Sequence, residues 1–151
     1  MARLAPILAN AYPGGAAWLE NRLLDVGSGD ARARVVIADG ALGGIAIETP
    51  KVDGQMKLST VWLAPELRNK GMGSELLGAC IADWRAEGIS RAWITSCATT
   101  LPAIEALVAQ HGFTFTAREV DRYGAGRDEW VFHWLPDGQR RSKSRATTLT
   151  S

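Results

Sequence analysis

The chain has 151 residues, of which 46% are hydrophobic and 22% charged, with a formal net charge of +1; these values are ordinary for one globular domain. No apolar run is long enough to span a bilayer, and the N-terminus lacks the residue order of a secretory signal, so we expect no membrane partner. The two cysteines, Cys80 and Cys97, have no metal-ligand spacing, which predicts no bound metal and a reducing, cytoplasmic setting.

The charge is unevenly distributed along the chain. Residues 136–151 contain four basic residues and one acidic residue, which leaves 13 basic and 15 acidic residues in 1–135. A body with a net charge of −2 does not favour nucleic-acid binding. We expect one domain over 1–135 and a flexible basic tail over 136–151, which offers only a weak route to an anionic partner.

The first half of the chain predicts two helices followed by three strands. Helical spacing of apolar residues covers 2–11 and 16–26, divided by Tyr12-Pro13-Gly14-Gly15. Strands follow at 34–38, 42–48 and 56–63. Asp39-Gly40 is a hairpin signal, and a second turn is expected over 50–54, so these strands should be antiparallel.

The second half predicts alternating helices and strands. A helix over 71–87 buries one face and ends at Gly88, and a second helix covers 101–111. Strands are expected at 92–96, 113–120 and 130–135. The strands at 56–63 and 92–96 are joined through a helix, so they should be parallel neighbours. The fold class is therefore α/β (α+β), with a mixed sheet of about six strands flanked by helices.

The turn from Arg68 to Ser74 is the most informative motif. It reads Arg-Asn-Lys-Gly-Met-Gly-Ser and joins the strand at 56–63 to the helix at 71–87. The N-terminus of a helix presents unpaired N–H groups and a partial positive charge, and glycines let a ligand approach the backbone. With Arg68 and Lys70 beside it, the turn is typical of a phosphate-binding site.

The element order and this turn together resemble the GNAT superfamily of acyl-CoA-dependent N-acyltransferases. The family motif, Gln/Arg-x-x-Gly-x-Gly/Ala, reads Arg68-x-x-Gly71-x-Gly73 here, and Gly112-Phe113 matches the Gly-Phe pair that commonly follows the second core helix. The resemblance covers roughly residues 35–135. It implies that the parallel strands splay and form a slot for coenzyme A.

The resemblance implies acetyl-CoA as co-substrate and an amine as acceptor. The turn would hold the pyrophosphate, and the end of the preceding strand would pair with the pantetheine arm. The implied cofactor-binding residues are Val61, Trp62, Leu63, Arg68, Asn69, Lys70, Gly71, Met72, Gly73 and Ser74. Family members are often dimers, so a homodimer is an open expectation.

The usual acid and base of the family are absent. The common tyrosine position falls on Val108, and a common glutamate position falls on Ser96. The candidate catalytic residues are therefore Glu48 as a proton relay, Ser96 beside the expected thioester, and Tyr123 as a phenolic acid. For Glu48 the alternative is an exposed strand-end carboxylate, and for Tyr123 it is a loop anchor.

The remaining cysteine, histidine and aromatic side chains are less specific signals. Cys97 is either an acyl-accepting nucleophile or a small buried hydrophobe, and His111 is expected to cap the end of its helix. Trp84 and Trp93 are expected in the core. Trp18 and Trp130, with Tyr12, either line an acceptor pocket or fill the core.

Three functions follow from these patterns. The first is N-acetyl transfer from acetyl-CoA to an amine by direct attack. The second is a catalytically silent module of the same fold that binds CoA or a protein. The third is an acetylating toxin that acts on aminoacyl-tRNA, which the negative body and Val108 disfavour.

Overall fold

The computed structural model describes residue 6 and residues 14–137. The predicted helix at 2–11, apart from Pro6, and the tail from residue 138 onward lie outside the described residues. The helices are α2 (Gly15–Ser28), α3 (Met72–Glu87) and α4 (Leu101–Ala109), and the strands are β1 (Arg32–Ala38), β2 (Ala41–Lys51), β3 (Gln55–Leu63), β4 (Arg91–Cys97), β5 (Thr114–Glu119) and β6 (Glu129–Trp134), with short 3₁₀ turns at Val52–Gly54 and Pro65–Leu67.

The strands form one mixed sheet in the order β1-β2-β3-β4-β6-β5. The pairs β1–β2 and β2–β3 are antiparallel, and β3 and β4 are parallel, as the sequence predicts. The Asp39-Gly40 turn closes the first hairpin with both residues at positive φ (51° and 72°), which is the geometry of the tightest hairpin loops. The predicted six-strand α/β architecture is confirmed.

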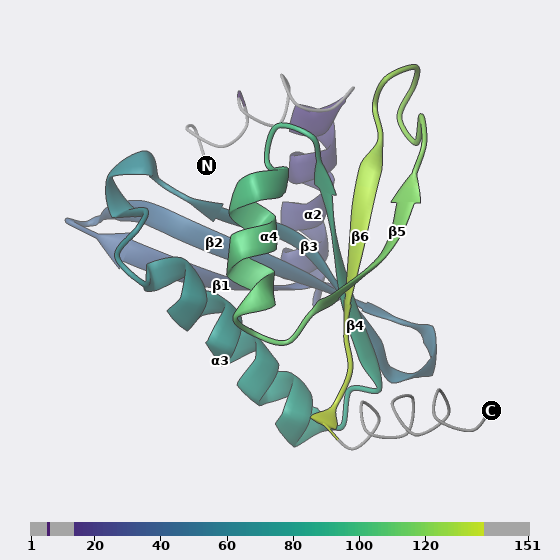
Figure 1. Ribbon diagram of the computed structural model, residues 1–151. Coiled ribbons are helices and arrows are strands. Elements are labelled where there is room, and N and C mark those ends of the chain that lie inside the picture. The colour runs from purple at the N-terminus through teal and green to yellow at the C-terminus, as the bar shows by residue number, and fades with distance from the viewer. Residues whose placement is uncertain (1–5, 7–13, 138–151) are drawn as a thin grey trace.

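Helices cover both faces of the sheet. α3 and α4 lie on one face and α2 on the other (Figure 1). The larger hydrophobic cluster joins the sheet to α3 and α4 through Leu76, Leu77 and Trp84 of α3 and Val108 of α4. The smaller cluster joins it to α2 through Leu19, with partly buried Trp18 against it. Strand β2 is therefore buried on both sides.

Strand β3 contains a bulge that changes which face its side chains point to. Ile47 of β2 pairs with Thr60 and Glu48 pairs with Leu58, so Ser59 is one residue extra on β3. Before the bulge Leu58 packs in the α3 cluster; after it Trp62 packs in the α2 cluster. A bulge shifts the alternation by one and bends the strand.

Several predicted boundaries and one core residue differ from the structure. The turn predicted at 50–54 is wrong at its start, because β2 continues to Lys51. The helix predicted to end at His111 ends at Ala109. Trp93 is half-buried on the α2 face rather than in the core, with its ring against His133. Trp134 instead lies in the core, 5.5 Å from the ring of Trp84.

None of the helices in the described part of the chain is long and apolar enough to cross a membrane.

The packing predicts different reactivities for the two free cysteines. Cys80 is completely buried on α3, and burial raises the pKa of its thiol to about 11, with the nearby Glu48 adding to the shift. Cys97 is half-buried at the end of β4. Since the thiolate is the reactive form, we expect one thiol per chain to react with iodoacetamide at pH 8, and peptide mass mapping to locate it at Cys97. Labelling of Cys80 at the same rate in the folded protein would contradict this packing, and labelling of both thiols in urea is the control.

Candidate functional site

The parallel strands separate where the candidate site begins. β3 and β4 pair only from Gln55 with Arg91 to Lys57 with Trp93. Beyond Lys57, β3 stays paired with β2, and β4 stays paired with β6, but their inner edges do not pair with each other. Backbone N–H and C=O groups of a strand normally find partners. Beyond Lys57 the inner edge of β3 is therefore not paired with β4, as the predicted splay requires.

The N-terminus of α3 lies directly after this open edge. The first hydrogen bond of α3 runs from the Glu75 N–H to the Gly71 carbonyl, and no side chain caps the helix. In the described chain, the N–H groups of Met72, Gly73 and Ser74 therefore have no acceptor. Gly71 has φ 79°, a left-handed conformation that side chains disfavour, and a Cβ atom there would meet nothing within 4 Å. Unpaired N–H groups at a helix N-terminus, beside a glycine with open space, are the geometry that favours an anion.

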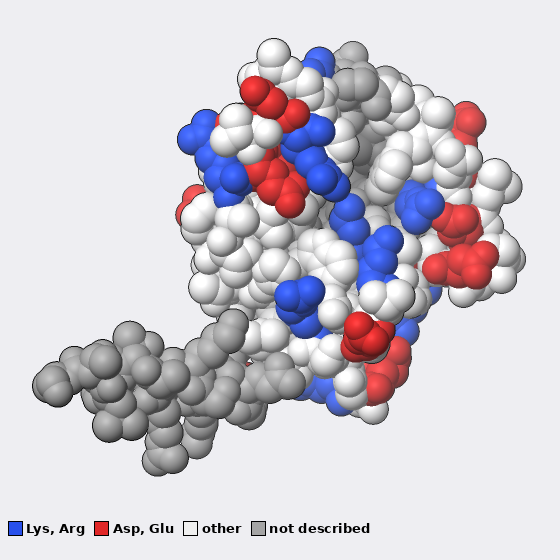
Figure 2. All heavy atoms as spheres, turned by 90° about the vertical axis from the view of Figure 1, so that its right-hand side faces the viewer, with Lys and Arg blue, Asp and Glu red and all other residues white. Residues whose placement is uncertain are grey.

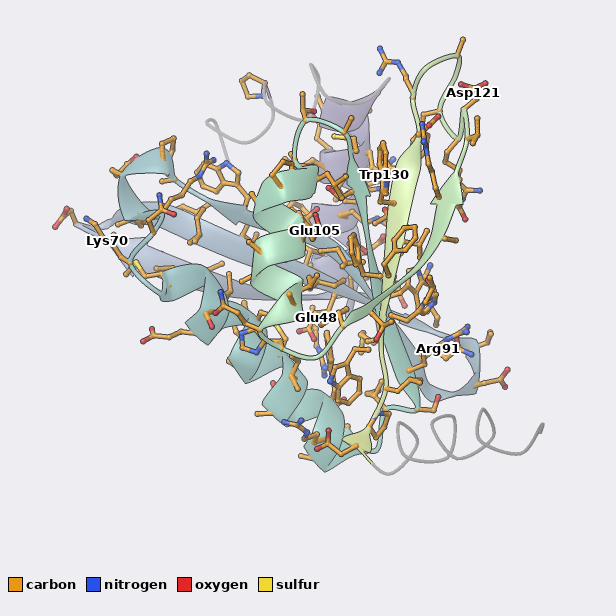
Figure 3. All side chains as sticks on the ribbon, viewed as in Figure 1. Glu48, Lys70, Arg91, Glu105, Asp121 and Trp130 are labelled. Carbon is orange, nitrogen blue, oxygen red and sulfur yellow. The ribbon has the colours of Figure 1, made fainter. Side chains whose placement is uncertain are left out.

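Two residues of the turn are positioned by the end of β3. The Arg68 Nε donates to the Leu63 carbonyl at 3.0 Å. Among the described residues nothing engages the terminal nitrogens of this exposed guanidinium. A Cβ on Gly73 would lie 3.2 Å from a methyl group of Leu63, so this glycine lets α3 pack against β3. Lys70 lies at the outer edge of the molecule, on the same turn (Figure 3).

His111 contacts this turn instead of capping its own helix with its side chain. Its Nε2 lies 2.8 Å from the Ser74 Oγ, and a Cβ on Gly78 would lie 3.5 Å from its ring. The expected capping role is therefore replaced by a contact that ties the end of α4 to the first turn of α3. The signal was present in the sequence only as a histidine followed by Gly112-Phe113.

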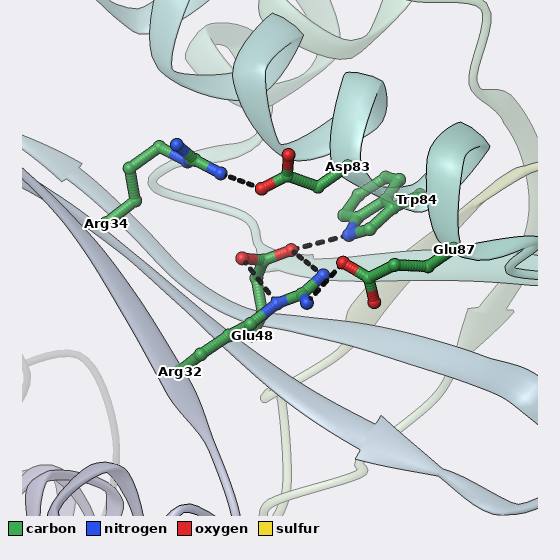
Figure 4. Close-up of polar contacts among 6 residues, drawn as sticks. All are labelled: Arg32, Arg34, Glu48, Asp83, Trp84 and Glu87. Atoms are coloured by element: carbon green, nitrogen blue, oxygen red, sulfur yellow. Dashed lines mark hydrogen bonds and ion pairs between the residues drawn. The ribbon is translucent and has the colours of Figure 1, made fainter.

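Glu48 is buried beneath α3, and its carboxylate is fully engaged. Its side chain is 1% exposed, so the exposed alternative is wrong. The Arg32 Nε and the Trp84 Nε1 both donate to it (Figure 4), the former at 3.1 Å. Arg32 also pairs with Glu87 at 2.6 Å, and Arg34 pairs with Asp83 beside them. This network joins β1 and β2 to α3.

The other two candidate catalytic residues lie on separate elements. Ser96 is buried at the end of β4, where its Oγ donates to the Cys97 carbonyl and lies 2.8 Å from the Thr100 Oγ1. Tyr123 is 42% exposed in the β5–β6 loop, with Arg122 over its ring. In the described part of the chain no hydrogen bond joins any two of Glu48, Ser96 and Tyr123. Val108, in the tyrosine position, is a core residue.

Two charged residues that the motif search missed lie on the α2 face. Lys57 is half-buried on β3 between Met56 and Leu58, which both point to the α3 cluster. Glu129 is 1% exposed at the start of β6, directly across from Cys97. Burial lowers the pKa of Lys57, and the positive charges of Lys51 and Arg122 lower it further. Their only signal in the sequence was a charge within an alternating strand.

The tryptophans are divided between the two faces. Trp18 packs partly buried against the α2 cluster, and Trp130 packs partly buried against the α3 cluster with Arg118 5.1 Å over its ring. Tyr12 lies outside the described residues. Within the described ranges no group of three His, Cys, Asp or Glu side chains is arranged to hold a metal ion.

Comparison with known proteins places this geometry in a family. Residues 7–113 match the model of the acetyltransferase (GNAT) family. No curated protein matches the chain. Among solved structures, a GNAT-family protein from Desulfovibrio desulfuricans is 19% identical with a TM-score of 0.71, covering 89% of this chain and 91% of its own.

Two further structures share the fold. A GNAT family acetyltransferase from Elizabethkingia anophelis, solved with acetyl-CoA bound, is 14% identical with a TM-score of 0.63, covering 76% of this chain and 82% of its own. The ribosomal-protein-S18-alanine N-acetyltransferase of Escherichia coli is 21% identical with a TM-score of 0.61, covering 70% and 69%. At these identities the likeness is one of fold.

The contacts of Glu48 predict a large effect on stability. We expect Glu48→Gln to lower the free energy of unfolding by about 2–4 kcal/mol, because the amide places a donor against Arg32 in a buried site. Glu87→Gln is the matched control; Glu87 is 44% exposed, and its loss should cost less than about 1 kcal/mol. Urea denaturation measures both. Equal stability of the two variants, with turnover lost only in Glu48→Gln, would instead identify Glu48 as a proton relay.

Proposed function

Because the chain belongs to the GNAT acetyltransferase family, we propose that it transfers an acetyl group from acetyl-CoA to an amine acceptor. The observation that carries this proposal is the open inner edge of β3 leading directly into the uncapped N-terminus of α3. An extended pantetheine arm followed by a pyrophosphate has the matching shape and charge. The acetyl-CoA bound to the Elizabethkingia relative supports the choice of co-substrate.

The donor is held by backbone groups and by the basic turn. The N–H groups of 72–74 receive the pyrophosphate, and Arg68, anchored through its Nε to the Leu63 carbonyl, adds charge-assisted hydrogen bonds. Asn69, Lys70 and Gly71 complete the exposed turn. The inner edge of β3 at Val61, Trp62 and Leu63 pairs with the arm, which directs the thioester toward the point where the strands separate.

The chemistry is direct attack by the acceptor amine. The neutral amine forms the new C–N bond at the thioester carbonyl, and the C–S bond breaks. The nitrogen loses one proton as the amide forms and the leaving thiolate takes up one, so the products are the N-acetylated acceptor and free CoA with its thiol. Backbone N–H groups of β3 polarise the carbonyl, and positioning supplies much of the rate. This requires a group on the acceptor face to accept the proton of the incoming ammonium.

Among the carboxylates, the contacts favour Glu129 over Glu48 for this role. Glu48 faces α3 and is bound by Arg32 and Trp84, so we assign it a structural role. Glu129 shares a face with Lys57 and adjoins Cys97 at the open end of the strands. Ser96 orders the turn after β4, and Tyr123 remains a candidate acid on the exposed loop.

A CoA-binding module without chemistry is the second candidate. The observation that favours it is Val108, which fills the usual acid position with a core side chain. Release of free CoA in the presence of an amine excludes this candidate. The aminoacyl-tRNA acceptor, the homodimer and the cytoplasmic setting stay predictions.

Acetyl-CoA should stabilise the protein. At a hundredfold excess over its dissociation constant we expect about 2.7 kcal/mol of added stability, or roughly 5–10 °C in Tm. Arg68→Ala should weaken acetyl-CoA binding about tenfold or more, whereas S-acetylpantetheine, which lacks the pyrophosphate, should bind equally to both proteins. Thermal shift and calorimetry measure these differences.

Arg85→Ala is the control for this experiment. Arg85 lies in the last turn of α3, at the opposite end from the proposed pyrophosphate site, and is exposed. Its loss should therefore leave the affinity for acetyl-CoA within about twofold of the wild-type value. A wild-type protein that no acyl-CoA stabilises would overturn the proposed function.

A further inference from the structure

Lys57 lies at the point where the two parallel strands part. It forms the last rung of the β3–β4 ladder, with Trp93. Met56 and Leu58 on either side point into the α3 cluster, so Lys57 points to the face that α2 covers. Under the proposed function, the thioester lies just beyond this rung, which places the Lys57 side chain beside the reacting carbon on the acceptor face.

Lys57 has no hydrogen-bond or ion-pair partner in the part of the chain that the structure describes. It is half-buried, yet no hydrogen bond or ion pair engages its ammonium among the described residues. Arg32, which lies on β1 and points to the opposite face of the sheet, differs in this respect. It forms ion pairs with both Glu48 and Glu87. A partly desolvated cation without a direct ion pair is costly to hold, and an anionic ligand would lower that cost.

The surroundings of Lys57 are mostly positive. Lys51, Arg122 and Arg22 act on its charge from three other elements, against the one carboxylate of Glu129. Arg22 and Arg122 are paired with Asp25 and Glu119, whereas Lys51, like Lys57, has no such partner in the described chain. Figure 2 shows several Lys and Arg side chains in the middle of the face on the β5 side of the sheet, with Asp and Glu side chains beside them at the upper left, at the right and below the centre.

Two hydroxyl groups lie beside Lys57 on the same face of the sheet. Thr49 is directly opposite Lys57 on β2, and its Oγ1 lies 2.7 Å from the Oγ of Ser59 in the bulge. In such a pair one hydroxyl donates its proton to the other, so the second hydroxyl can donate its own proton to a ligand oxygen. Ammonium and hydroxyl donors on one face are the groups that recognise a carboxylate or phosphate.

We propose that Lys57 binds an anionic group of the acceptor, so that the substrate is a small amine carrying a carboxylate or phosphate close to its nitrogen. The inference rests on the proposed function and adds the chemical class of the acceptor. The anion lies on Lys57 and the Thr49–Ser59 hydroxyl pair, and Glu129 faces the ammonium. Lys57 and the hydroxyl pair orient the nitrogen toward the thioester and take no part in bond breaking.

Matched acceptors test this assignment. CoA release from acetyl-CoA is measured with each common L-amino acid beside its carboxamide, and with O-phosphoethanolamine beside ethanolamine, each rate expressed per unprotonated amine. We expect the anionic member of at least one pair to have a kcat/KM about tenfold to a hundredfold higher. The pair that shows the preference distinguishes a carboxylate from a phosphate.

Variants locate the preference. Lys57→Met should raise the KM of the anionic acceptor about tenfold or more and remove the preference, with acetyl-CoA affinity unchanged, and Lys57→Arg should restore part of it. Arg91→Met is the control, because this exposed cation lies 5.8 Å over the Trp93 ring on the same face but is already bound to Gln55; it should keep the preference.

The outcomes separate the two proposals. Neutral acceptors that match or exceed the anionic ones, a preference that survives in Lys57→Met, or no turnover of any pair by protein that acetyl-CoA stabilises would each overturn the anionic acceptor and leave the cofactor site standing. Absence of stabilisation by any acyl-CoA would instead remove the proposed function itself.

Discussion

The bulge at Ser59 is the constraint on which the rest of the structure depends. One extra residue on β3 shifts its register against β2, and the parallel ladder with β4 ends two residues before it, at Lys57 and Trp93. Because a bulge bends its strand, we infer that it contributes to the separation of β3 from β4. The same residue shifts the alternation of β3, so that Leu58 packs under α3 and Trp62 packs under α2. One irregularity therefore helps to open the edge and divides the core.

Donor binding and acceptor binding rest on different kinds of groups. In the proposed function, the donor side consists of strand-edge backbone and the first N–H groups of α3, with Gly71 in a left-handed conformation that few other residues adopt. A site made of backbone groups tolerates many side-chain changes around it. The proposed acceptor side consists of side chains, whose identities decide its charge and shape. The glycine turn therefore marks the fold, whereas the acceptor must be inferred from the charges on the other face.

The features that could be predicted from the sequence are those that depend on local rules for turns, helix ends and strand connections. Asp39-Gly40, Gly88 and the spacing of α3 fixed turns and helix ends correctly, and the helix between β3 and β4 implied their parallel pairing. The burial of Glu48 was missed because β2 is covered on both faces, so alternation carries no information about exposure there. The bulge was missed because Ser59 alternates normally in the sequence. Only the pairing with β2 reveals that it is extra.

Glu48 and Lys57 show how buried charge separates structure from function. They lie on adjacent strands and point to opposite faces of the same sheet. Glu48 is bound by Arg32 and Trp84, and its charge is used entirely within the fold. Lys57 is half-buried without a protein partner among the described residues. Burial alone would rank Glu48 above Lys57 as a candidate ligand-binding residue. The contacts reverse that order, because only a charge without a partner gains from binding a ligand.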